Sequence, residues 1–127
     1  MWGTRLRMAI GGGKYIEVMD WLDLVSYFFG GVLLGNAVPH FVSGTMGRPF
    51  QTPFAKPPGE GLSSSVVNVC WGAFNAVVGY VLVCRVGSFD WKSTVDVAAC
   101  GLGVLLIGVF SAWNFGRFNG GNARERE

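Results

Sequence analysis

The chain has 127 residues, of which 50% are hydrophobic and 14% are charged, whereas about a quarter of the residues in a typical soluble domain are charged. Its formal net charge of +2 excludes the strongly basic character on which nucleic-acid binding depends. The charged residues fall in short blocks separated by long uncharged stretches, a distribution typical of membrane-spanning helices. The sequence therefore predicts one all-α integral membrane domain that crosses the bilayer three times.

The N-terminal segment, residues 1–18, is expected to lie outside the hydrocarbon core. Trp2, Leu6 and Ile10 would share one face of a helix, so one interpretation is a short helix on the membrane surface and the other is a flexible segment. Three consecutive glycines, beginning at Gly11, interrupt the first apolar run. This interruption argues against a cleavable signal peptide.

The first predicted transmembrane helix covers residues 21–38. At a rise of about 1.5 Å per residue, it is barely long enough for a hydrocarbon core about 30 Å thick. Asp20 and Asp23 lie at its beginning, where carboxylates interact favourably with the helix dipole. Pro39 is expected to end or kink the helix because proline has no backbone N–H.

Residues 39–62 form the connection to the second helix and contain all five prolines of the chain. This composition predicts a structured loop rather than a regular helix or strand. The segment retains Phe41, Met46, Phe50 and Phe54, which a purely solvated linker would not need. Long loops in small domains are usually functional, so we expect contact with a partner or lipid. The alternatives are the lining of a small-molecule site and a simple connection.

The second and third predicted transmembrane helices cover residues 65–84 and 95–115. The second carries no charged residue, and the third is uncharged after Asp96. Ser93 lies three residues before Asp96, a spacing that resembles a capping box with Asp in place of Glu or Gln. Residues 116–127 end in a polar, charged sequence and are predicted to form a flexible tail.

Tryptophans support this topology. With three crossings, Trp21 and Trp91 would lie at one membrane face, and Trp71 and Trp113 at the other, as expected for aromatic residues at both interfaces. Five Lys or Arg residues would lie on each side, so the distribution of positive charge leaves the orientation undetermined.

Small and amide side chains form a stripe along the second predicted helix, at spacings of four, three and four residues. Residues at these spacings share one helical face. Because small residues permit close backbone approach and asparagine amides bond across helices, the stripe predicts a packing contact. A polar lining for a substrate or ion path is the alternative. The predicted contact, here called the Asn/Gly seam, comprises Gly31 and Gly35 of the first predicted helix together with Asn68, Gly72, Asn75 and Gly79 of the second.

A second set of polar residues gathers at one membrane face because the first helix ends, the second begins and the third ends there. This set would suit a quinone head group, an anionic lipid phosphate or a partner's backbone. Interhelical hydrogen bonds, with arginines reaching to lipid head groups, are the alternative. The candidate ligand or partner site comprises Asn36, His40, Arg48, Ser111, Asn114 and Arg117.

Catalytic and metal chemistry find little support in the sequence. His40 is the only histidine, so paired histidine ligation of haem within the chain is excluded and no zinc motif is present. No cofactor or metal is predicted, although His40 could serve as the single axial ligand of a haem or chlorophyll. Cys70, Cys84 and Cys100 lie in apolar runs and are expected to be buried apolar residues. No serine has a dedicated base and acid, so an enzyme is not favoured.

The sequence thus favours a multi-pass membrane protein that acts as a small non-catalytic subunit of a larger membrane assembly. Its expected partners are the lipid bilayer and either other membrane subunits or copies of itself, and no nucleic acid. One alternative is a homo-oligomeric channel or transporter whose path is lined by the asparagines of the second helix. Another is a lipid-, quinone- or pigment-binding protein that uses the region around His40.

Overall fold

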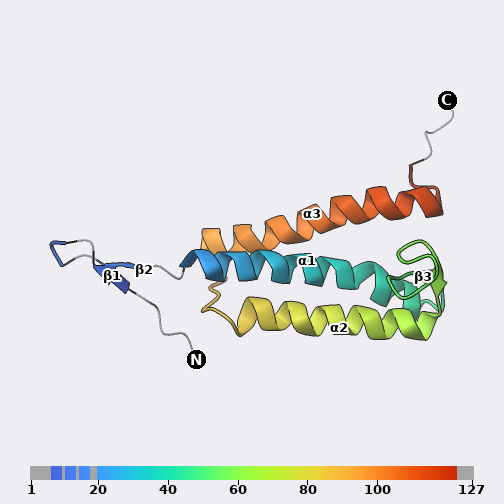
Figure 1. Ribbon diagram of the computed structural model, residues 1–127, viewed down its shortest axis with the longest axis horizontal. Helices are drawn as coiled ribbons and strands as arrows, with labels where there is room; N and C mark the ends of the chain where they lie inside the picture. Colours follow the sequence, from blue (N-terminus) through green and yellow to red (C-terminus); the bar gives the residue numbers. More distant parts are fainter. Residues whose placement is uncertain (1–6, 10, 14, 18–19, 123–127) are drawn as a thin grey trace.

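The computed structural model describes residues 7–9, 11–13, 15–17 and 20–122. Its three helices are α1 (Asp20–Thr45), α2 (Ser65–Cys84) and α3 (Thr94–Asn119), and its short strands are β1 (Arg7–Ala9), β2 (Tyr15–Glu17), β3 (Phe50–Gln51) and β4 (Leu62–Ser63) (Figure 1). The strands pair in two antiparallel hairpins, β1 with β2 and β3 with β4. All three helices are long and apolar enough to cross a membrane, so the predicted number and order of such helices are confirmed.

The beginnings of α2 and α3 follow from serine caps. The Ser64 side chain accepts a hydrogen bond from the backbone N–H of Val67, and the Ser93 side chain accepts one from Asp96. These bonds satisfy N–H groups that have no partner within the first helical turn. The Asp96 carboxylate accepts a hydrogen bond from the backbone N–H of Asp90 rather than from that of Ser93. Only one of the two hydrogen bonds of a capping box is therefore formed.

α1 continues through Pro39 to Thr45, which corrects the prediction that the first helix stops at residue 38 and that residues 39–45 belong to the loop. Proline removes one backbone hydrogen bond but leaves the rest of the helix intact, and membrane helices often tolerate it. The added turns are held by packing, because Gly44 lies directly against the backbone of Ser65 and Val69. α3 likewise extends beyond residue 115.

The N-terminal segment also differs from its helical interpretation. β1 and β2 form a hairpin connected through Gly11, Gly12 and Gly13, all of which have positive φ angles. This backbone conformation is readily available to glycine and interrupts a helix. Trp2, Leu6 and Ile10, which carried the helical interpretation, lie outside the described residues, as does the end of the predicted tail at 123–127.

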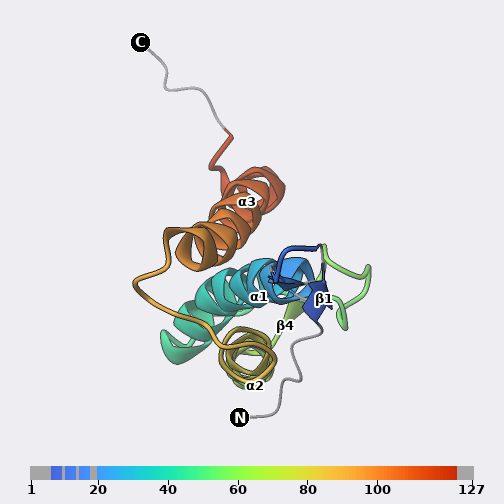
Figure 2. The same cartoon turned by 90° about the vertical axis from the view of Figure 1, so that its left-hand side faces the viewer.

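The helices form a single layer with α1 in the middle. α1 packs against α2 on one side and α3 on the other, whereas α2 and α3 make few contacts with each other (Figures 1 and 2). Only 11% of the residues in the most apolar stretch of α3 are buried. Cys70 and Cys84 are exposed and Cys100 is half-buried, which corrects the expectation of buried cysteines, because each outer helix has only one neighbour.

Glycines allow the helices to approach closely. A methyl group added at Gly72 would lie 2.7 Å from the backbone nitrogen of Phe41, and one at Gly79 would lie 2.8 Å from Cγ of Leu34. On the other side of α1, Gly31 faces the backbone of Cys100. Glycine is therefore used here to bring backbones together, as small residues do in closely packed membrane helices.

The Gly72→Ala substitution is expected to destabilise the fold by about 1–3 kcal/mol because the new methyl group would overlap the Phe41 backbone. Unfolding of the purified protein by sodium dodecyl sulfate, followed by far-ultraviolet circular dichroism, would measure the loss. Gly101→Ala is the matched control, since nothing lies within 4 Å of the added methyl group. Equal destabilisation by both substitutions would contradict the packing role of Gly72.

Candidate functional site

The side-chain amide of Asn68 connects three parts of the chain. Asn68 is fully buried on the face of α2 that meets α1, and its Oδ1 lies 3.0 Å from Nδ1 of His40 in α1. Its Nδ2 lies 3.0–3.2 Å from the carbonyl oxygens of Phe50, Ser63 and Ser64. One amide therefore joins α1 to α2 and holds both strands of the β3–β4 hairpin against them.

The surroundings of Asn68 determine which His40 nitrogen carries the proton. Because Nδ2 of Asn68 faces carbonyl acceptors, its Oδ1 must be the atom that faces His40, and Nδ1 of His40 donates to it. In the neutral imidazole, Nε2 then has a free lone pair. Nε2 makes no hydrogen bond within the described part of the chain.

Aromatic rings from three elements surround the His40 imidazole, which is 2% exposed. Its ring centroid lies 5.4 Å from that of Phe50 in β3, 6.4 Å from Trp71 in α2 and 6.0 Å from Phe115 in α3, all edge-on. His40 therefore lies where the loop and all three helices meet. The imidazole with these three rings is called the His40 box below.

A second amide pair lies along the same contact between α1 and α2. Nδ2 of Asn36 donates to Oδ1 of Asn75 at 3.1 Å, and Nδ2 of Asn75 donates to the backbone oxygen of Trp71 at 2.8 Å. Asn75 is 1% exposed. The structure thus places both asparagines and both glycines of α2 in the Asn/Gly seam against α1, while Gly31 and Gly35 face α3.

The sequence predicts a structured loop between α1 and α2 but not the particular contacts within it. The backbone oxygen of Thr52 accepts hydrogen bonds from the N–H groups of Ala55 and Gly59, and its buried hydroxyl pairs with that of Ser63. Because a threonine before a proline is common in turns, the sequence does not indicate that Thr52 is buried. The Phe54 ring packs edge-on against Trp71 at 4.9 Å.

The candidate ligand site predicted from the sequence is divided in the structure. Asn36 and His40 are joined to α2, whereas Arg117 turns to its own helix and donates to Oδ1 of Asn114 at 2.6 Å. Among the described residues, no hydrogen bond connects Arg48 or Ser111 to His40. This separation of Arg117 from His40 follows from the single layer of helices. At the end of α3, the ring that contacts His40 is that of Phe115.

Two buried polar atoms near the loop have no hydrogen-bond partner among the described residues, namely Oε1 of Gln51 and Nε1 of Trp71. Gln51 was not identified from the sequence, and Trp71 was predicted only as a tryptophan at a membrane face, because nothing in the spacing of either residue indicates a buried polar atom. Within residues 7–9, 11–13, 15–17 and 20–122, no group of three or more His, Cys, Asp or Glu side chains could hold a metal ion.

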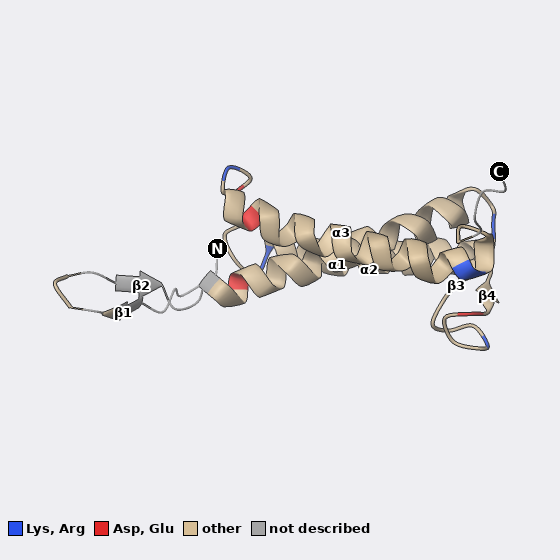
Figure 3. Cartoon of the chain, turned by 90° about the horizontal axis from the view of Figure 1, so that it is seen from above, with Lys and Arg blue, Asp and Glu red and all other residues tan. Residues whose placement is uncertain are grey.

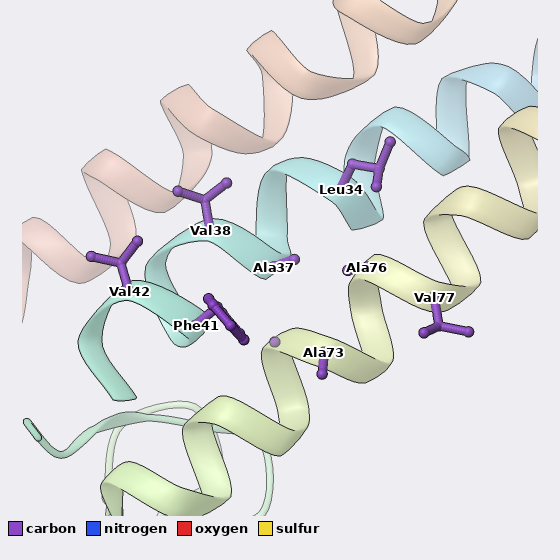
Figure 4. A pocket seen from close by; sticks show the side chains of 9 residues that line it. Leu34, Ala37, Val38, Phe41, Val42, Ala73, Ala76 and Val77 are labelled. Carbon is purple, nitrogen blue, oxygen red and sulfur yellow. The ribbon is translucent and has the colours of Figure 1, made fainter. Parts of the chain in front are cut away.

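An open apolar groove of ≈ 510 Å³ runs between α1 and α2. Figure 4 shows Ala37 and Ala76 on opposite sides of it, with Phe41 directed toward α2. The groove offers almost no polar surface, so it suits a hydrocarbon chain rather than a polar substrate. It is lined by Leu34, Ala37, Val38, Phe41, Val42, Gly72, Ala73, Ala76 and Val77.

Comparison of the chain with protein-family models, curated proteins and solved structures finds no match.

Replacement of Asn68 by alanine should destabilise the protein by about 1–3 kcal/mol, because it leaves buried carbonyl groups and His40 without their partner. It should also increase cleavage of the loop at Glu60 by a glutamyl endopeptidase, since the amide no longer holds the hairpin. Asn75→Ala is the control: it should cost about 0.6 kcal/mol and leave cleavage at Glu60 unchanged. Unchanged cleavage in Asn68→Ala would show that the amide does not anchor the loop.

Proposed function

We propose that this chain is an integral membrane protein that acts as a small non-catalytic subunit, packing into or stabilising a larger membrane assembly. The observation that carries the proposal is the single layer of helices around α1. A layer leaves two broad faces uncovered, and large apolar side chains are exposed on all three helices. Lipid chains and neighbouring helices are the surroundings that such faces require.

The distribution of charge supports placement in a bilayer. Figure 3 shows the charged residues of the described region gathered at the two ends of the helices, with uncharged helix between them. A hydrocarbon core tolerates this arrangement because ionised groups remain near water.

The exposed side of α3 is suited to contact with another helix. Gly101 and Gly108 lie two turns apart, and an added methyl group at either would meet nothing within 4 Å. Leu105 and Val109, on neighbouring positions, are each 62% exposed. Small residues beside large apolar ones let a second helix approach closely, which is how membrane helices associate.

The channel alternative receives less support. It requires the amides of Asn68 and Asn75 to line a path, but both are buried and hydrogen-bonded to α1. The packing role of these asparagines accounts for their bonds without a path.

The pigment-binding alternative rests on one observation at the His40 box. A metal-ligating histidine usually donates its second ring N–H to a fixed acceptor, and Nδ1 of His40 donates to Asn68. If His40 is an axial ligand, the purified protein will show a visible absorption band that His40→Ala abolishes. Purified protein without such a band would remove this alternative.

The subunit proposal predicts that the tagged protein, expressed in its own cell and extracted in mild detergent, migrates with other membrane proteins in a particle several times its own mass. Native gel electrophoresis with mass spectrometry of the particle would measure this. A monomer that is stable alone and carries no other chain would contradict the proposal.

The Gly108→Leu substitution should release the chain from that particle without unfolding it, because the added side chain projects from α3 into open space. Leu106→Phe is the matched control, since it adds bulk at an exposed position on the other side of α3. Loss of assembly in both variants, or in neither, would show that the Gly101–Gly108 face is not the contact.

A further inference from the structure

Three positively charged side chains lie at the end of the molecule where α1 ends, α2 begins and α3 ends. Arg48, Lys56 and Arg117 are all exposed, and Figure 3 shows positive charge at this end. The only acidic residue of the described region here is Glu60, and no salt bridge among those residues joins it to the three cations. The described side chains at this end therefore keep a net positive charge.

The opposite end of the helices has the reverse balance. Asp23, Asp90 and Asp96 lie there together with Arg85 and Lys92, and Figure 3 shows negative charge on α1 and α3 at this end. Among the side chains that the structure describes at this end, three carboxylates stand against two cations, which disfavours other anions. Among the described side chains, positive charge therefore prevails at one end of the helices and negative charge at the other.

Arg117 is held in a position typical of residues at a lipid head-group layer. Its guanidinium lies 5.3 Å from the ring of Trp113 and 5.0 Å from that of Phe118, both of which are exposed. Its Nε and Nη2 donate hydrogen bonds to Asn114, so the Nη1 hydrogens have no partner in the described region. An arginine above exposed aromatic rings, with free donors, matches the interfacial region of a bilayer.

The loop between α1 and α2 combines cations with exposed apolar side chains. Met46, Phe54 and Leu62 are 60%, 62% and 60% exposed, close in sequence to Arg48 and Lys56. Water alone would disfavour these apolar groups, whereas the boundary between head groups and acyl chains accommodates both kinds of side chain.

We propose that this surface, formed by Arg48, Lys56, Arg117 and the exposed apolar residues of the loop and here called the loop end, binds the head groups of anionic phospholipids. The cations attract lipid phosphates while the carboxylates at the other end are repelled by them. Because the cytoplasmic leaflet carries most anionic lipid, the loop end faces the cytoplasm. This inference rests on the proposed function and adds to it a lipid class and an orientation.

The experiment compares binding of phosphatidylglycerol and phosphatidylcholine to the purified chain by native mass spectrometry from detergent at low salt. The wild type should prefer phosphatidylglycerol. In the double variant Arg48→Gln with Lys56→Gln, the preference for phosphatidylglycerol should fall roughly five-fold for each cation removed. The matched control, Arg85→Gln with Lys92→Gln, removes the same charge from the other end and should keep the preference.

Equal losses in the two double variants, or no preference in the wild type, would overturn the proposal. A salt titration of the unmodified protein gives a readout free of folding effects, since about 1 M salt should suppress an electrostatic preference. Because this measurement uses the chain alone, it is independent of whether larger assemblies are recovered.

Orientation is tested with single cysteines in a background in which Cys70, Cys84 and Cys100 are replaced by alanine. Pro58→Cys reports on the loop end and Ser88→Cys on the opposite end, both at exposed positions. In intact cells, a membrane-impermeant maleimide should label Ser88→Cys, and it should label Pro58→Cys only after permeabilisation. The reverse pattern would overturn the assignment of the loop end to the cytoplasmic leaflet.

Discussion

The side-chain amide of Asn68 must be fully hydrogen-bonded because it is buried where no water is expected to compete, and much of the structure depends on this constraint. It is satisfied only when His40 lies opposite and the β3–β4 hairpin is folded back onto the helices. The amide therefore sets the position of α1 along α2 and the position of the loop at the same time. A shift of either element would leave a buried polar group without a partner, at a cost of about 1–3 kcal/mol.

The glycines and the amides of the seam depend on each other. Gly72 lies between Asn68 and Asn75 along α2 and brings the α1 backbone close. Without that approach, the short asparagine side chains would not reach across to Asn36 and His40. Close packing thus makes the hydrogen bonds geometrically available, and the bonds make the packed arrangement specific, since apolar contact alone tolerates sliding.

Hydropathy was enough to predict the three helices, because length and absence of charge are local properties. The spacing of Asn68, Gly72, Asn75 and Gly79 indicated one helical face but not which helix it meets. The continuation of α1 through Pro39 was missed because the packing that supports it, at Gly44, comes from α2. The loop hairpin and the separation of Arg117 from His40 also depend on contacts between distant parts of the chain, which no local pattern encodes.

The two contacts of α1 differ in kind. Close backbone approach occurs on both sides of α1, as at Gly72 and Gly31. On the α2 side, the side chains of Ser26, Asn36 and His40 add hydrogen bonds between the helices. Chains are synthesised from the N-terminus, so α1 and α2 are made before α3. The directional bonds can therefore close as soon as the first two helices have been made, which gives α3 an assembled surface to join during biogenesis.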